Sequence, residues 1–224
     1  MIYLFLVILF SFLNFFYIKI WKTFFNNTPT GSGIFLLIPL IYFGIISEIY
    51  IIVFILFLFS FAYFFDDLFG IKYIYRIILQ ILAAISIFSI STLELNFYYI
   101  LLFISFFLII CNSLNFQDGQ DLNVASLLIM IFCLFLFFSN NILIRNISII
   151  TLIYLLVFLF FNSKSNNLYF GDNGCFISTI IIFLFLIEDS QNLLLIKYLS
   201  SIIIFPLTDV FLCCVFEFTK EKIY

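Results

Sequence analysis

The sequence has no histidine, and only 9% of its residues are charged. The absence of histidine excludes imidazole general bases, imidazole metal ligands and Ser-His-Asp triads. Any chemistry must therefore come from carboxylates, amides, hydroxyls, a few cations or a hard metal ion. The five cysteines lack CxxC spacing and are interpreted as small apolar residues.

Long polar stretches are also lacking. Two thirds of the chain (66%) is hydrophobic and the mean hydropathy is +1.32, which excludes a soluble domain of this length. Because lipid offers the backbone no hydrogen-bond partners, the composition predicts an all-α polytopic integral membrane bundle. We expect residues 1–224 to form a single transmembrane domain that contacts membrane lipid and no nucleic acid.

Apolar runs between polar breaks predict about nine transmembrane helices. The runs are 1–20, 34–47, 49–65, 73–92, 97–114, 122–139, 142–161, 174–187 and 192–206. The second and eighth are short for a span, which needs ~20 residues. Ser47-Glu48 is interpreted as a turn, although one long tilted helix through this point is the alternative.

The distribution of basic residues predicts that the N-terminus lies outside. With this orientation, only Arg145 and Lys197 fall on the outer side. The cytoplasmic helix ends would carry Lys19, Lys22, Lys72, Arg76, Lys164, Lys220 and Lys222. The cytoplasmic loops would then lie near 22–33, 66–72, 115–121, 162–173 and 206–224.

Aspartates gather on the same predicted side. They are Asp66, Asp67, Asp118, Asp121, Asp172 and Asp209. Few cations are available to pair with them, and like charges at a membrane surface repel one another. A bound Mg²⁺ is an economical way to hold such carboxylates together.

The polar stretch Asn112–Asp121 stands between two apolar runs and is the strongest functional signal. Asn112 and Asn115 are three residues apart, as are Asp118 and Asp121, so each pair shares a face if the backbone is helical. In another loop, glycines flank Asp172 just before a span. This pattern predicts a helix N-terminus whose free N–H groups can receive phosphate.

Taken in order, the five loops resemble the polyprenyl-phosphate N-acetylhexosamine-1-phosphate transferases of glycosyl transferase family 4. The loops of that family read roughly PTPRGGG, then DD, then NxxNxxDGxDG, then an Asn followed by FxGDxGS, then PxxD. The matching segments here are Thr28–Gly33, Asp66-Asp67, Asn112–Asp121, Asn162 with Phe170–Gly174, and Pro206–Asp209.

The resemblance implies transfer of a sugar-1-phosphate, in particular N-acetylhexosamine-1-phosphate, from a UDP-sugar to undecaprenyl phosphate, with release of UMP. This reaction starts the synthesis of cell-envelope polysaccharide such as lipopolysaccharide. It would take place at the cytoplasmic face of the bacterial inner membrane and depend on Mg²⁺, with Mn²⁺ as the alternative. Relatives are often dimers, so a homodimer is also implied.

The resemblance also implies roles for residues. Asp172 would bind the metal, and Asp66 and Asp67 would act on the lipid-phosphate side as base or as metal-associated ligand. Tyr169 matches an aromatic residue that could stack on uracil. The nucleotide-sugar site would be lined by Asn112, Asn115, Asp118, Asp121 and Asn162.

The chain departs from the family pattern at several positions. The unusual residues are Thr30 for arginine, Ser32 and Leu122 for glycine, and Cys175 for serine. The family continues past PxxD into a loop with an HxHH-type motif, whereas this sequence ends at Tyr224, so we expect a C-terminally shortened member.

Three other functions fit parts of the pattern. One is the phospho-N-acetylmuramoyl-pentapeptide transferase of peptidoglycan synthesis, and another is an inactive, truncated relative. A cation-linked transporter is the alternative from a different class. Against the transporter, every aspartate lies at the end of a predicted span, whereas ion pathways place acids near the bilayer midplane.

Overall fold

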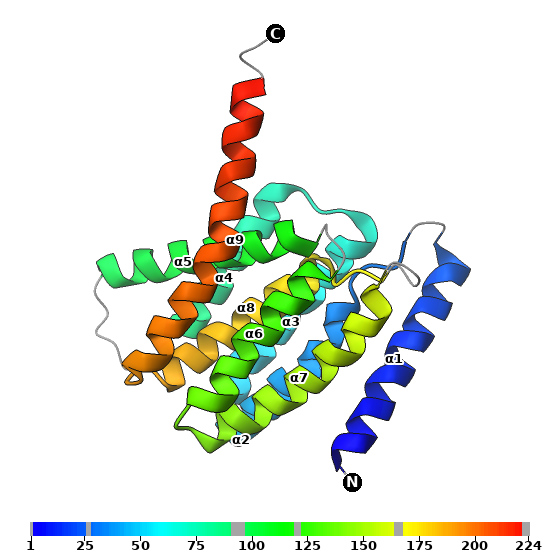
Figure 1. The fold of residues 1–224 in the computed structure, drawn as a ribbon, viewed down its shortest axis with the longest axis horizontal. Helices are drawn as coiled ribbons and strands as arrows, with labels where there is room; N and C mark the ends of the chain where they lie inside the picture. The colour runs from blue at the N-terminus through cyan, green and yellow to red at the C-terminus, as the bar shows by residue number, and fades with distance from the viewer. Residues whose placement is uncertain (1, 26–27, 91–96, 119–121, 164–167, 221–224) are drawn as a thin grey trace.

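The computed structural model describes residues 2–25, 28–90, 97–118, 122–163 and 168–220, with the side chains of 205 and 209–220 set aside. Every regular element within these residues is helical, so the prediction of an all-α fold is confirmed (Figure 1). The elements are α1 (Ile2–Phe24), the 3-10 helix η1 (Ser32–Leu36), α2 (Leu37–Ile46), α3 (Tyr50–Phe69), α4 (Tyr73–Phe88), α5 (Phe97–Asp118), α6 (Asn123–Phe138), α7 (Ile142–Asn162), α8 (Gly171–Glu188) and α9 (Leu193–Lys220).

Five helices are long and apolar enough to cross a membrane, namely α1, α3, α5, α7 and α8. The other apolar segments, Ser32–Ile46, α4, α6 and Leu193–Thr208, are shorter. A helix of 16 residues such as α4 is about 24 Å long, against ~30 Å of hydrocarbon. The bundle is that of a membrane protein, while nine spans with the N-terminus outside remain a prediction.

Several segments expected to be loops are helical. Helix α3 continues through Asp66 and Asp67, α5 continues to Asp118, and α9 runs through Pro206 to Lys220. The reason is that a helix satisfies its own backbone, so it can extend into polar residues wherever their side chains find water or partners. The turn at Ser47-Glu48 is present, and Glu48 has a positive φ of 59°.

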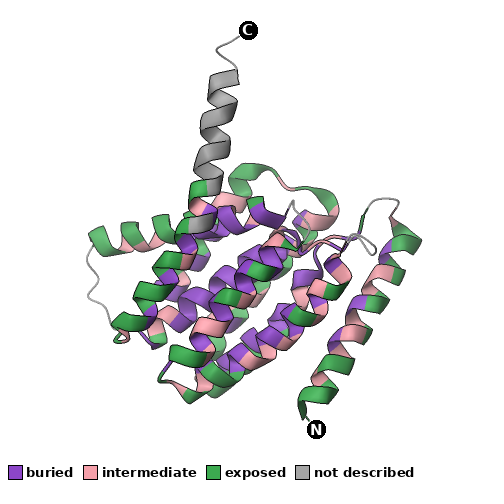
Figure 2. Ribbon diagram, in the orientation of Figure 1, coloured by how far each residue is buried: buried purple, intermediate pink, exposed green. Residues whose placement is uncertain are grey.

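Helix α8 is the central element of the bundle, because 14 of its 18 residues are buried (Figure 2). It packs against α2, α3, α4, α5 and η1. Aromatic rings fill these contacts: Tyr63 of α3 stacks on Phe176 at 4.2 Å, and Phe107 of α5 meets Phe183 edge-on at 5.1 Å. Helix α1, in contrast, exposes many large apolar side chains, as a lipid-facing helix does.

Four of the predicted cytoplasmic loops meet at one end of the bundle. The N–H of Gly33, after α1, donates to the carbonyl of Phe170, before α8, at 3.0 Å. The N–H of Leu122, between α5 and α6, donates to the side chain of Asn162, at the end of α7, at 2.7 Å. Helix α3 ends at the same place, because Asp67 binds the start of α8. The alternating helix directions therefore bring loops distant in sequence together (Figure 1).

Glycines allow the first loop to touch the start of α8. A Cβ added to Gly33 would lie 2.0 Å from the Cα of Gly174, and one added to Gly171 would lie 2.5 Å from the backbone nitrogen of Gly31. Gly171 also has a φ of +82°, which favours glycine. Only residues without side chains permit this approach of two backbones.

Replacement of Gly33 by alanine should destabilise the protein by about 3 kcal/mol or more, the upper end for overpacking, because the clash is with backbone. Thermal unfolding in detergent, followed by the fluorescence of Trp21, measures this. The matched control is Gly70→Ala, where a Cβ meets nothing within 4 Å and the backbone conformation alone (φ 71°, ψ 107°) costs about 1–3 kcal/mol. An equal or smaller effect at Gly33 would contradict the close approach.

Candidate active site

The N-terminus of α8 is capped by side chains from other helices. Phe170 occupies the N-cap position and has no side chain that can cap. Instead, the carboxylate of Asp118, at the end of α5, accepts the N–H of Phe170 at 3.1 Å and that of Gly171 at 2.7 Å. Both oxygens of Asp118 are thus engaged, and the residue is buried.

A second carboxylate, that of Asp67 in the last turn of α3, completes the cap. It accepts the N–H of Asp172 at 2.9 Å and that of Asn173 at 3.2 Å. Four consecutive N–H groups are therefore bound by two carboxylates, which also suit the positive end of the helix dipole. The expectation that these N–H groups are free to receive phosphate is wrong for this structure.

Arg76, in the first turn of α4, joins two further carboxylates. Its Nε lies 2.5 Å from Oδ2 of Asp66 and its Nη2 lies 3.0 Å from Oδ1 of the same residue. Its Nη1 contacts Oδ2 of Asp172. Asp66 also accepts the N–H of Ile71 at 2.5 Å. Among the described residues, these are the ion pairs that the structure contains.

Amide side chains of α5 lie beside Arg76 and the two carboxylates that it binds. The side chain of Asn115 neighbours the Asp172 carboxylate. One turn earlier, the amide nitrogen of Asn112 donates to Gln80 of α4 at 3.1 Å, and Gln80 in turn contacts Cys111 at 3.5 Å. The helical spacing of Asn112 and Asn115 therefore places both amides toward α4 and α8, in agreement with the shared face inferred from the sequence.

Asn162 and Tyr169 form hydrogen bonds that connect loop segments near the site. The side chain of Asn162 is buried, accepts the N–H of Leu122 and donates to the carbonyl of Leu168, both at 2.7 Å. The backbone of Tyr169 donates to the carbonyl of Pro29 at 2.9 Å and accepts the hydroxyl of Ser32 at 3.1 Å. The Tyr169 side chain is half-buried.

The structure brings together most of the residues that the sequence singled out: Asp66, Asp67, Asn112, Asn115, Asp118, Asn162, Tyr169 and Asp172. Asp121 lies outside the described residues, and so does the side chain of Asp209. Sequence reasoning did not assign Gln80 to the site, and for Arg76 it left open whether the residue attracts anionic substrates or anchors a cytoplasmic helix end. The pattern that could have indicated both residues is that Arg76 and Gln80 follow Asp66-Asp67 in sequence and are four residues apart, so they share one face of a helix.

A divalent cation fits the chemistry of one part of this cluster. Asp66 and Asp172 approach the same guanidinium, so their carboxylates face a common space, and the neighbouring Asn115 supplies an amide. The described residues contain no group of three preorganised acidic, histidine or cysteine ligands. Mg²⁺ is often held by one or two carboxylates together with substrate oxygens and water, which this arrangement permits.

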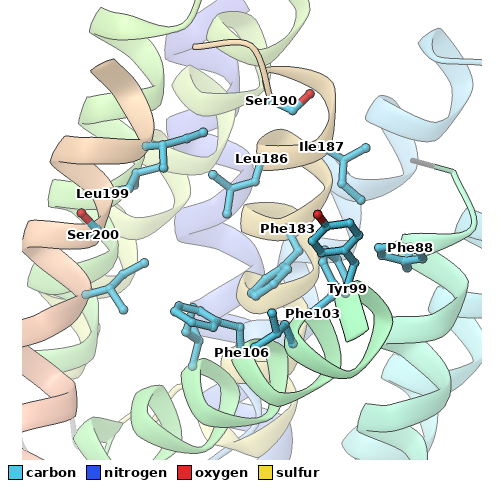
Figure 3. A pocket seen from close by; sticks show the side chains of 14 residues that line it. Phe88, Tyr99, Phe103, Phe106, Phe183, Leu186, Ile187, Ser190, Leu199 and Ser200 are labelled. Atoms are coloured by element: carbon cyan, nitrogen blue, oxygen red, sulfur yellow. The ribbon is translucent and has the colours of Figure 1, made fainter. Parts of the chain in front are cut away.

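An apolar cavity of about 520 Å³ lies between α5, α8 and α9 (Figure 3). Phe103, Phe106, Phe183, Leu186 and Leu199 line it, and its polar groups are the hydroxyls of Tyr99, Ser190 and Ser200. Ser190 follows the C-terminus of α8, so the cavity extends toward the end of the bundle opposite Asp172.

The chain matches the family model described as glycosyl transferase family 4 over residues 48–189 and belongs to that family. The match covers more than half of the chain and includes α3 to α8, with Asp66, Asp67 and Asp172. No match was found among curated proteins. The first loop lies outside the matched residues, yet the structure joins it to the site through Gly31 and Gly33.

Replacement of Asp118 by asparagine should loosen the start of α8, because an amide retains one acceptor and turns a donor toward a second N–H. Loss of one charge-assisted hydrogen bond, about 1.5–3 kcal/mol, should raise amide exchange at residues 170–171 by about tenfold or more. Hydrogen exchange with mass spectrometry measures this. The control is Asp189→Asn, at the other end of α8; unchanged exchange in Asp118→Asn would refute the capping role.

Proposed function

We propose that this protein transfers a sugar-1-phosphate, in particular N-acetylhexosamine-1-phosphate, from a UDP-sugar to undecaprenyl phosphate and releases UMP. The reaction would take place at the cytoplasmic face of the bacterial inner membrane and initiate synthesis of a cell-envelope polysaccharide. One observation carries the proposal: within a domain of a transferase family, acidic and amide side chains from separate helices converge at one end of an apolar bundle.

In this reaction an oxygen of the lipid phosphate attacks the sugar-bearing phosphorus of the UDP-sugar. A new phosphorus–oxygen bond forms, and the bond to UMP breaks. Two anions must meet, so the site has to neutralise charge, align the phosphates and exclude water. A bound Mg²⁺, or Mn²⁺, supplies charge neutralisation at the diphosphate.

The described contacts support a division of roles among the carboxylates. Asp172 would hold the metal, oriented by Asn115, and Asp66 would serve the lipid-phosphate side as base or metal-associated ligand. Asp67 and Asp118 would instead position α8, because their oxygens accept backbone N–H groups. The nucleotide-sugar would meet the amides of Asn112 and Asn115, with Asn162 positioning the loop beneath it.

The lipid tail needs an apolar environment, and the bundle offers one. The exposed large side chains of the helices and the cavity between α5, α8 and α9 have the right chemistry for an isoprenoid chain. The described acids of the cluster lie in the terminal turns of α3, α5 and α8. A transporter would be expected to place such acids near mid-helix, so the transferase is the better supported function.

Purified protein with Mg²⁺ should convert radiolabelled UDP-GlcNAc, or another UDP-sugar, and undecaprenyl phosphate into the lipid-linked sugar and UMP. EDTA should abolish the product. Asp172→Asn should lower kcat by about a hundredfold or more, because the metal loses its carboxylate. Asp67→Asn should lower both the rate of transfer and the thermal stability of the protein, because it weakens the cap of α8.

The matched control is Asp189→Asn, the same chemical change at the opposite end of α8, which should leave transfer unchanged. Absence of product with every UDP-sugar, from wild-type protein shown to be folded, would reject the proposed reaction. Activity that persists in EDTA would reject the metal-dependent form of it.

A further inference from the structure

Arg76 occupies the position between two carboxylates that the proposed function assigns to metal and substrate. Its guanidinium binds Asp66 through two nitrogens, Nε and Nη2, and reaches Asp172 with the third, Nη1. The side chain of Asp66 is 1% exposed, that of Asp172 20% and that of Arg76 30%. Arg76 therefore binds a fully buried carboxylate, that of Asp66, and a partly exposed one, that of Asp172.

The acids of the cluster differ in how their charge is compensated. Asp67 and Asp118 face the positive end of α8 and accept its N–H groups. Asp66 and Asp172 depend on Arg76, because it forms the ion pairs found among the described residues. Lys72 lies nearby in sequence, is exposed and forms no ion pair within the described part of the chain.

A divalent cation and this guanidinium cannot share the same oxygen of Asp172. Mg²⁺ binds carboxylate oxygens at about 2.0–2.1 Å and requires nearly ideal octahedral geometry. A guanidinium nitrogen on that oxygen would block part of the coordination shell and repel the metal. Binding of the metal at Oδ2 of Asp172 would therefore release Nη1 of Arg76.

We propose that Arg76 is a positioning residue that exchanges partners. Without metal it holds the Asp172 carboxylate in place as a counter-cation. When a divalent cation binds Asp172, Arg76 keeps its two-nitrogen contact with Asp66 and turns Nη1 to a phosphate oxygen of the ligand. The planar guanidinium suits this role, because its donors diverge in a fixed fork that serves a carboxylate and a phosphate at once.

This inference rests on the proposed function only in assuming that a divalent cation and a phosphate ligand use the same site. The exchange predicts effects of opposite sign when Arg76 is removed. Metal binding without nucleotide should tighten, because a competitor is lost. Binding of a diphosphate in the presence of metal should weaken, because a donor is lost. Any positive charge near the site would give the same two signs, so the effect at Arg76 has to exceed that at a nearby lysine outside the cluster.

The test compares wild-type protein, Arg76→Gln and Arg76→Lys, each as the full chain in detergent. Mn²⁺ is the probe for metal, with free Mn²⁺ quantified by electron paramagnetic resonance. Arg76→Gln should bind Mn²⁺ roughly three- to tenfold more tightly, the range for loss of a partly exposed charge pair. UDP affinity at saturating Mg²⁺, from titration calorimetry, should fall by a similar factor.

The control Lys72→Gln removes the same charge from the same turn and should change both affinities less than twofold. Equal tightening in this control would overturn the proposal in favour of a general surface-charge effect. Unchanged or weaker Mn²⁺ binding in Arg76→Gln would also overturn it.

Arg76→Lys covers the case in which Arg76→Gln fails to fold for lack of a partner for the buried Asp66. A single ammonium competes for Asp172 less well than the fork, so Mn²⁺ binding should tighten by a smaller factor, and no tightening would overturn the proposal. Sugar transfer is not measured in these experiments. A protein without transfer activity can therefore still show the exchange, and an active one can lack it.

Discussion

The capture of four backbone N–H groups at the start of α8 is the interaction on which the rest of this structure depends. The first N–H groups of any helix lack partners within the helix, and each costs about 1–3 kcal/mol when buried unsatisfied. Helix α8 lies at the centre of an apolar bundle, and its N-cap residue, Phe170, cannot supply a partner. Asp67 and Asp118 supply it from α3 and α5, across 105 and 52 residues of sequence. The cap therefore fixes three helices relative to one another.

This constraint explains why adjacent aspartates have different surroundings. Successive residues of a helix point about 100° apart, so Asp66 and Asp67 cannot face the same group. Asp67 faces the backbone of α8, whereas Asp66 faces α4 and binds Arg76. Asp172 sits in the capped turn itself, with its N–H held by Asp67 and its carboxylate free to meet Arg76. Within a few residues, the cluster thus contains carboxylates that bind the backbone of α8 and carboxylates that bind Arg76.

Much of this fold could be predicted from the sequence. The apolar runs gave the positions of the helices, and polar breaks such as Ser47-Glu48 gave turns, because lipid admits few other solutions. Motif order and alternating direction predicted which loops would gather, and four of them do. The contacts that each side chain makes within the cluster could not be predicted from the sequence. Nothing local to Asp118 or Asn162 indicates that their polar atoms bind distant backbone, since that depends on how helices pack.

The charge balance of the cluster bears on how a metal ion would bind. Asp67 and Asp118 are already stabilised by the positive end of α8, so they contribute little to attracting a further cation. Asp66 and Asp172 carry two formal negative charges and Arg76 one positive charge, which leaves a single net negative charge. Mg²⁺ sheds its water reluctantly and is commonly bound through one or two carboxylates plus phosphate oxygens. A site of this kind would bind metal weakly by itself, and a phosphate ligand would complete the coordination. The metal and the phosphate ligand would therefore bind cooperatively, each raising the affinity of the site for the other. The complete coordination shell would then form only when substrate is bound.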